Sequence, residues 1–319
     1  MNMTLHPLIP FEPVRSDTIP AGEEWVYQIK WDGVRLLAYL ERGEMRLFNR
    51  KKRERTFHYP EIADRFRSFC RAESVILDGE IIALGEDGKP SFHEVMRRDG
   101  LRRMELVPQM QAIVPVTYMV FDLLYLNGRR IVSKPLEERQ HLLSEWIRPG
   151  EHLQLVANYR DGEKLFQVTK EQDMEGIVCK RRDSAYAVGG KDGRWVKVKN
   201  YGDILAAIGG FTLNGGIVNS VLLGLYGQEG RFYYIGHTGT GKLSKEEWRK
   251  LTELLRPKVI EEMPFVNRPE RYKDAFWVEP AVCVKVRYSE WRWREGRSLR
   301  QPSIQSFVDV SPHECKFPF

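Results

Sequence analysis

The stretch Lys30-Trp31-Asp32-Gly33-Val34-Arg35 decides how the first half of the chain folds. Before it, apolar side chains recur at every second position of residues 25–29, which predicts a strand. Asp32-Gly33 is typical of a turn, and Val34 to Leu40 predicts a second strand. We therefore expect Lys30 at a strand end, with its amine in a cleft.

The residue types in this stretch suit phosphate chemistry. A lysine amine becomes a nucleophile when burial or nearby cations depress its pKa. Gly33 would allow a ligand to approach the backbone closely, and Arg35 could form a fork onto a ribose or phosphate oxygen. The alternative for the stretch alone is a surface hairpin with a solvated lysine.

Further along the chain, charged and aromatic residues lie in four more predicted strands. These are Leu77-Asp78-Gly79-Glu80, Phe121-Asp122, Glu175-Gly176-Ile177-Val178-Cys179-Lys180 and Trp195-Val196-Lys197-Val198-Lys199. In the last strand Lys197 and Lys199 share a face, because side chains repeat every two residues. Two cations near Lys30 suit a phosphate; the alternative is the polar outer face of an edge strand.

In this order the stretches resemble the nucleotidyltransferase motifs KxDGxR, DGE, an aromatic before Asp, EGxxxK and WxKxK of ATP-dependent DNA ligases. The region Ile204 to Pro302 resembles the oligonucleotide-binding (OB) domain of that family. The strongest likeness is to the ligase domain of bacterial LigD-type, end-joining ligases. The resemblance implies an α+β chain. Residues 1–201 would form a nucleotidyltransferase (adenylation) domain of antiparallel sheets flanked by helices, and residues 202–319 an OB-fold β-barrel.

Periodicity also predicts individual elements. Residues 1–22 suggest an extended lead-in, and helices are expected at 60–69, 91–98, 135–147 and 162–170, with a buried strand at 113–126. In the second half, strands are expected at 204–212, 218–226, 231–237, 278–288 and 291–299. A capping box at Ser244–Glu247 opens a helix between the third and fourth of these strands. Such an order fits a partly open OB barrel.

The resemblance also implies the reaction. Lys30 attacks the α-phosphate of ATP to give lysyl-AMP, the AMP passes to the 5′-phosphate of a nick, and the 3′-hydroxyl displaces it. The cofactors would be ATP and Mg²⁺, or Mn²⁺. By resemblance, the nucleotide-binding residues are Gln28, Arg35, Arg50, Glu80, Phe121, Glu175, Lys180, Lys197 and Lys199, with Glu80 and Glu175 as metal ligands.

Each residue has an expected role. Lys197, Lys199 and the metal would lower the pKa of Lys30 by like-charge repulsion. Arg35 and Arg50 would bind sugar or phosphate, Lys180 would contact phosphates, and Phe121 would stack on adenine. For Phe121 the rival is core packing, and for Glu80 and Glu175 it is a solvated carboxylate at a strand end.

Three positions depart from the family pattern. Gln28 stands where relatives usually carry a glutamate that reads the adenine amino group, although its side-chain carbonyl still accepts a hydrogen bond. Gly189-Gly190-Lys191-Asp192 replaces Gly-x-Arg-Ser. Val308-Asp309-Val310-Ser311 stands where an RxDK motif is expected.

Composition sets the remaining bounds. The 319 residues suffice for two domains, and no run approaches the roughly 20 apolar residues of a membrane span. Without a signal peptide at 1–10, and with four cysteines that form no CxxC pair, we expect a cytoplasmic protein. The net charge of +6 favours a polyanionic partner. We expect nicked or broken double-stranded DNA, with a Ku-like end-binding protein as a further partner, no membrane, and a monomer.

Three other functions remain open. The chain could be an RNA ligase or a capping guanylyltransferase, since both share KxDG. It could also be a non-catalytic module that binds nicks or ends, because the RxDK motif is missing.

Overall fold

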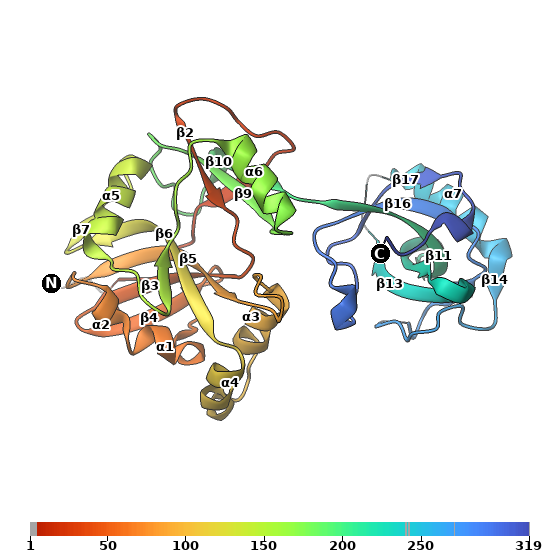
Figure 1. The fold of residues 1–319 in the computed structure, drawn as a ribbon, viewed down its shortest axis with the longest axis horizontal. Helices are drawn as coiled ribbons and strands as arrows, with labels where there is room; N and C mark the ends of the chain where they lie inside the picture. The colour runs from red at the N-terminus through yellow and green to blue at the C-terminus, as the bar shows by residue number, and fades with distance from the viewer. Residues whose placement is uncertain (1–4, 240, 242, 271, 319) are drawn as a thin grey trace. The chain divides into compact units, whose positions relative to one another are not determined.

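The computed structural model describes residues 5–239, 241, 243–270 and 272–318. The chain divides into one compact unit up to Asn200 and a second from Tyr201 (Figure 1). Each unit is described by itself below. Within the described residues, no helix has both the length and the apolar character needed to cross a membrane.

The first unit contains a six-stranded sheet with the order β4-β3-β5-β6-β7 and with β8 beside β6. Its strands are β3 (Val34–Glu41), β4 (Glu44–Asn49), β5 (Val75–Ala83), β6 (Val116–Leu126), β7 (Arg129–Arg130) and β8 (Leu153–Leu155). Arg42 and Gly43 both have positive φ, which makes the tight β3–β4 turn. Only the β6–β8 pairing is parallel in this sheet, so the predicted antiparallel arrangement holds for its other pairs.

Short helices cover the outer face of this sheet. They are α1 (Pro60–Ala63), α2 (Phe66–Phe69), α3 (Phe92–Asp99), α4 (Val107–Ile113) and α5 (Leu136–Trp146). Phe66, Val95 and Leu143 from three of them join the core formed by Leu36 and Leu77 of the sheet. The helix predicted at 60–69 is therefore two short helices, and the strand predicted from residue 113 begins at Val116, after Pro115.

A second, four-stranded sheet has the order β1-β10-β9-β2. Its strands are β1 (Glu12–Arg15), β2 (Trp25–Ile29), β9 (Gly176–Arg181) and β10 (Lys191–Lys199). The lead-in thus contains a strand that the sequence did not predict. Pro13 obscured it, since proline is tolerated only on edge strands, and β1 is an edge strand that pairs parallel with β10.

The two sheets of the first unit face one another across a small core. On one side of this core are Leu37 and Tyr39 of β3 and Ile76 of β5. They pack with Trp195 of β10 and with Phe11, the residue before β1. The outer face of the four-stranded sheet packs on α6 (Gly162–Glu171) through Leu165. The space between the inner faces is where the charged motif residues meet.

In its described residues, the second unit is a curved sheet with one α-helix and several short 3-10 helices. Its elements are β11 (Gly202–Asn214), β12 (Ile217–Tyr226), β13 (Phe232–Thr238), α7 (Lys245–Leu255), β14 (Val259–Ile260), β15 (Phe276–Val278), β16 (Cys283–Tyr288) and β17 (Ser303–Val308). β11 pairs with β12 on one edge and with β15 and β16 on the other. A bridge between Gly241 and Ile304 brings the chain after β13 beside β17, so the sheet curls into a partly open barrel. The OB-type fold and the predicted capping box before α7 are confirmed.

Two predicted strands of this unit were wrong. The strand expected at 278–288 is two strands, because β15 ends before Pro280 and β16 begins at Cys283. The strand expected at 291–299 is a loop with a short 3-10 helix at Trp293–Glu295 and a turn at Gly296, whose φ is 69°. Its tryptophans have a high strand propensity, but they pack instead on Phe317.

Candidate active site

The inner face of the four-stranded sheet carries the predicted lysines. Trp25, Tyr27 and Ile29 of β2 point to the outer face of the sheet, into the core that it shares with α6. Gln28 and Lys30 therefore lie on the inner side. Strand register then sets their neighbours, because Gln28 pairs with Val178 of β9 and Val178 pairs with Lys197 of β10. The two-residue period places Lys199 on that same face, next to the end of β2.

Glu175 joins two of these lysines. Lys30 Nζ donates to Glu175 Oε2 at 2.5 Å, and Lys199 Nζ lies 2.7 Å from Glu175 Oε1. The Glu175 side chain is only 8% exposed. Burial would raise the pKa of Glu175, but the charges of Lys30 and Lys199 outweigh burial and lower it. One buried carboxylate therefore holds two ammonium groups at one point between the sheets.

Gly176 makes this arrangement possible. Its φ is +129°, a conformation that favours glycine, and a Cβ built on it would lie 2.2 Å from the carbonyl oxygen of Val198. Its own carbonyl accepts a hydrogen bond from the backbone N–H of Lys30 at 2.9 Å. The glycine of the EGxxxK pattern thus lets β2, β9 and β10 meet where their charged side chains converge.

The pKa of Lys30 differs from our expectation. Burial lowers this pKa, but the negative charges of Glu175 and then Glu80 raise it by more than burial lowers it. The net shift is therefore upward. The expectation that neighbouring cations lower this pKa was wrong for the protein without a nucleotide, because Glu175 lies against both Lys30 and Lys199. The pKa of Lys197 is lowered, first by burial and then by the charge of Lys30.

Glu80 approaches Lys30 from the six-stranded sheet. It lies opposite Arg35 in the β3–β5 pairing. A Cβ on Gly33 would lie 2.1 Å from the carbonyl oxygen of Ile81, so the turn after Lys30 packs directly against β5. Burial raises the pKa of Glu80 to about 8, against the opposing charges of Lys30 and Arg35.

Glu80 and Glu175 have the chemistry to hold a divalent cation together with a phosphate. No cluster of three or more ligating His, Cys, Asp or Glu residues occurs among the residues that the structure describes. Mg²⁺ is commonly bound by one or two carboxylates together with substrate phosphates and water. Both oxygens of Glu175 contact lysines, whereas Glu80 is a buried carboxyl whose pKa would fall beside a cation. The residues fit a metal that arrives with a nucleotide.

Arg35 directs its fork to a carboxylate of the neighbouring strand. Its Nε and Nη2 donate to the two oxygens of buried Asp78 at 2.9 and 2.6 Å, and Tyr186 Oη donates to the same carboxylate at 2.6 Å. In this arrangement Asp78, rather than a ribose or phosphate oxygen, takes the fork, and the contact of Arg35 with a nucleotide stays a prediction. Arg35 holds the KxDGxR strand to the DGE strand, a role that follows from the unexpected partner Asp78.

Lys180 and Phe121 lie together deeper between the sheets. Lys180 is 2% exposed, and its Nζ lies 4.1 Å from the ring centroid of Phe121 and 4.0 Å from that of Trp195. Burial lowers the pKa of Lys180 to about 7. These rings cover the amine of Lys180, and its contact with nucleotide phosphates stays a prediction. Phe121 packs partly in the core, with one face taken by Lys180.

Arg50 lies at the rim of the first unit. Its side chain is 63% exposed, and its Nη1 lies 3.3 Å from Glu12 Oε1. Glu12 in turn lies 4.0 Å from Arg35 Nη1. Arg50 is thus linked to the charged network but open to solvent.

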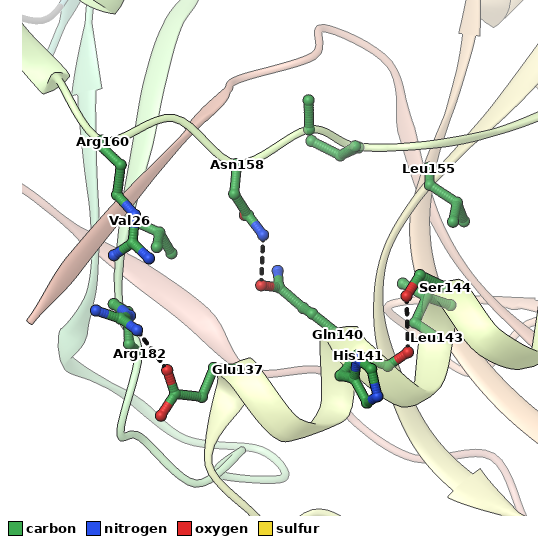
Figure 2. Close-up of a pocket in the computed structure, with 12 residues that line it drawn as sticks. Val26, Glu137, Gln140, His141, Leu143, Ser144, Leu155, Asn158, Arg160 and Arg182 are labelled. Carbon is green, nitrogen blue, oxygen red and sulfur yellow. Dashed lines mark hydrogen bonds and ion pairs between the residues drawn. The ribbon is translucent and has the colours of Figure 1, made fainter.

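Sequence reasoning missed three side chains around Gln28: Val178, Asn158 and Gln140. Val178 lies inside a quoted motif, and its position between Gln28 and Lys197 follows once the register is known. Asn158 and Gln140 carry no motif signal. They line a cavity of about 420 Å³ beside Val26 and face one another there (Figure 2).

Two family descriptions match most of the chain. Residues 14–199 match "ATP dependent DNA ligase domain", and residues 214–309 match "ATP dependent DNA ligase C terminal region". These spans fall in the first and the second unit, respectively.

Named relatives agree with this assignment. The chain is 35% identical over 300 residues to a "Multifunctional non-homologous end joining DNA repair protein LigD" of Mycobacterium tuberculosis, covering 92% of this chain but only 37% of that protein. It is 28% identical to a "DNA ligase" of Thermococcus onnurineus, with 95% and 55% coverage. Among solved structures, the ligase domain from M. tuberculosis LigD is 33% identical, with a TM-score of 0.52 and 97% coverage of both chains.

Proposed function

The chain belongs to the ATP-dependent DNA ligase family, and on this premise we propose that it seals nicks or breaks in double-stranded DNA through lysyl-AMP and DNA-adenylate intermediates. The observation that supports this most is the meeting of Lys30, Lys199 and Glu175 at one buried point. A lysine nucleophile, a second cation and a shared carboxylate provide the nucleophile, charge neutralisation and proton acceptor that phosphoryl transfer needs.

The first step would use these residues as follows. The Lys30 ammonium gives a proton to Glu175 or to water, and its freed lone pair forms a bond to the α-phosphorus of ATP while the bond to pyrophosphate breaks. The nitrogen then gives a second proton to water, which leaves lysyl-AMP. Lys197 and Lys199 stabilise charge on the α-phosphate, and Lys199 reaches it when the phosphate competes with Glu175. Most of the catalysis here is positioning and electrostatics rather than acid–base chemistry.

Glu80 would hold Mg²⁺ or Mn²⁺, with Glu175 nearby. The metal, when bound, neutralises charge on the phosphates. Gln28 and Val178 lie side by side on the inner face, where a base attached to that nucleotide would rest, with Phe121 between the sheets as its stacking partner. Arg50 would contact the nucleotide from the rim.

Several biological assignments go beyond the chemistry. We propose a cytoplasmic monomer that acts in DNA repair, with a Ku-like end-binding protein as its partner at broken ends. The name of the M. tuberculosis relative supports an end-joining role, although this chain spans only 37% of that protein. The net charge of +6 supports a polyanionic substrate.

The test is incubation with α-labelled ATP and Mg²⁺, followed by a denaturing gel, and then addition of nicked DNA or nicked RNA. A labelled protein band and sealed DNA support the proposal. No band with retained nick binding would favour the non-catalytic module. A band from GTP rather than ATP, or sealing of RNA alone, would favour a capping enzyme or an RNA ligase.

A further inference from the structure

A chain of three side-chain amides connects β2 to the six-stranded sheet. Gln28 Nε2 donates to Asn158 Oδ1 at 2.8 Å, and Asn158 Nδ2 donates to Gln140 Oε1 at 2.7 Å (Figure 2 shows the second bond). Gln140 Nε2 then donates to the backbone carbonyl of Phe121 at 3.4 Å. We call Gln28, Asn158 and Gln140 the amide relay.

The fold places each member of the amide relay independently. Backbone hydrogen bonds run both ways between Tyr27 and Tyr159, at 3.0 and 2.8 Å, and hold Asn158 beside Gln28. Gln140 lies on α5, which packs on β6, the strand of Phe121. The relay therefore spans from the strand of the nucleophile to the strand of the candidate stacking ring.

The far end of the relay fixes its polarity. A backbone carbonyl only accepts hydrogen bonds, so Gln140 must turn its NH₂ group toward Phe121 and its oxygen toward Asn158. Asn158 must then turn its oxygen toward Gln28, and Gln28 donates a hydrogen bond to that oxygen from its own NH₂ group. Within the described part of the chain, Gln28 Oε1 accepts no hydrogen bond, and Gln28 lies on the inner face next to Val178.

We infer that Asn158 and Gln140 are positioning residues that turn the carbonyl oxygen of Gln28 toward the nucleotide base and so select adenine over guanine. The inference rests on the proposed nucleotide transfer. Adenine carries an amino donor at C6 where guanine carries a carbonyl acceptor. An oriented Oε1 accepts a hydrogen bond from adenine and repels guanine.

An amide needs this help, whereas a carboxylate does not. Glutamine presents a donor or an acceptor depending on its flip, while an ionised glutamate accepts in either orientation. Gln28 is 2% exposed, so a wrong flip would leave its buried amide facing the wrong partner. Asn158 is exposed to water, which competes for its amide, so the expected effect is moderate.

The test compares two substitutions at one position, Gln140→Met and Gln140→Glu. Both substitutions remove the hydrogen bond to the Phe121 carbonyl. Only glutamate, whose carboxylate accepts hydrogen bonds, still requires Asn158 to donate its NH₂ group to residue 140. Single-turnover labelling of the protein with α-labelled ATP and α-labelled GTP gives an ATP/GTP rate ratio within each variant, so differences in the folded fraction cancel. Gln140→Met should lower this ratio about 5-fold, as the loss of one net hydrogen bond implies. Gln140→Glu should keep the ratio within about 2-fold of wild type.

A second background separates orientation from general damage. In Gln28→Glu the acceptor needs no orientation, so adding Gln140→Met should leave the ATP/GTP ratio of that background unchanged. An equal fall in both Gln140 variants, no fall in either, or a fall in the Gln28→Glu background would overturn the inference. Absence of any label in the wild-type protein would instead count against the proposed function itself.

Discussion

Lys30 Nζ lies 2.5 Å from Glu175 Oε2, so the candidate nucleophile is an ammonium held by a buried carboxylate. The pair fixes the direction of the lysine and provides the nearest acceptor for the proton that must leave before attack. Because the other oxygen of Glu175 contacts Lys199, an incoming phosphate can rearrange both lysines at once. On the proposed function, the site would change its charge pairing when the nucleotide arrives.

Gly176→Ala should disrupt this convergence. The φ of +129° and the 2.2 Å approach of a Cβ to Val198 predict a loss of unfolding free energy on the order of 1–3 kcal/mol, with slower AMP labelling. Urea titration measures the first effect and the denaturing gel the second. The matched control is Gly193→Ala in β10, where a Cβ meets nothing within 4 Å. Equal stability of the two variants would contradict the role given to Gly176.

The sequence predicted the charged core of the site because short-range pattern determines it. Alternation along β2 and β10 places Lys30, Lys197 and Lys199 on one face of the sheet. The pairing of β9 with both of these strands then brings the three lysines close together. It could not predict which partners the cations choose. Arg35 pairs with Asp78 and Lys180 lies on two rings, because contacts across the two sheets depend on tertiary packing.

The predicted bounds of several strands were wrong for local reasons. Pro13 in β1, Pro115 before β6 and Pro280 between β15 and β16 each interrupt or disguise a strand whose existence depends on its neighbours. The Trp291–Leu299 loop has the composition of a strand, yet its tryptophans gain more by packing on Phe317. Asn158 and Gln140 could not be found at all, since a hydrogen bond between residues 18 apart in the chain has no sequence signal.

Lys180→Met should stabilise the protein most at neutral and acidic pH. The pKa of Lys180 is about 7 in the folded state, below its ordinary value, so the unfolded chain binds the extra proton between pH 7 and about 10. The cost of burying the charge is full below pH 7 and fades as pH rises. Each pKa unit corresponds to roughly 1.4 kcal/mol, which predicts a gain of a few kcal/mol at pH 6.

Denaturant unfolding at pH 6, 8 and 10 measures the Lys180 effect, with exposed Lys51→Met as the control. The advantage of Lys180→Met should shrink steadily across the series. A gain that does not change with pH would mean that packing, rather than charge burial, sets the energy of this position.

Binding to nicked DNA should be weak and strongly salt-dependent. The surplus of positive charge favours contacts with phosphates, and each neutralised phosphate steepens the dependence of affinity on salt. Titration of a fluorescent nicked duplex from low to physiological salt measures the slope. An affinity that stays constant across this range would rule out a phosphate-dominated interface.

Self-adenylation should be slower than sealing. The segment that replaces RxDK lacks the arginine and lysine of that motif. Val308 and Val310 pack on the core of the second unit, and Ser311 caps a 3-10 helix. Arg300, a candidate substitute, pairs with Glu290 at 3.3 Å. Losing a positioned cation at a transferring phosphate costs on the order of 3 kcal/mol of transition-state stabilisation.

A single-turnover comparison tests this expectation, with enzyme plus ATP in one arm and enzyme plus a nick that already carries AMP in the other. Arg300→Ala extends it, because a substitute cation should affect only the first arm. Adenylation that is the faster of the two reactions would show that the missing motif has no such consequence.

The central claim is that Lys30 carries the AMP, and mapping the labelled residue tests it most directly. Wild-type protein incubated with α-labelled ATP and Mg²⁺ should be labelled on the peptide that contains Lys30. Lys30→Ala should lose all label, and Lys30→Arg should fail too, because a guanidinium stays protonated. The exposed control Lys191→Ala should remain labelled. A labelled Lys30→Ala protein, or a wild-type label mapped to any other lysine, would contradict the account.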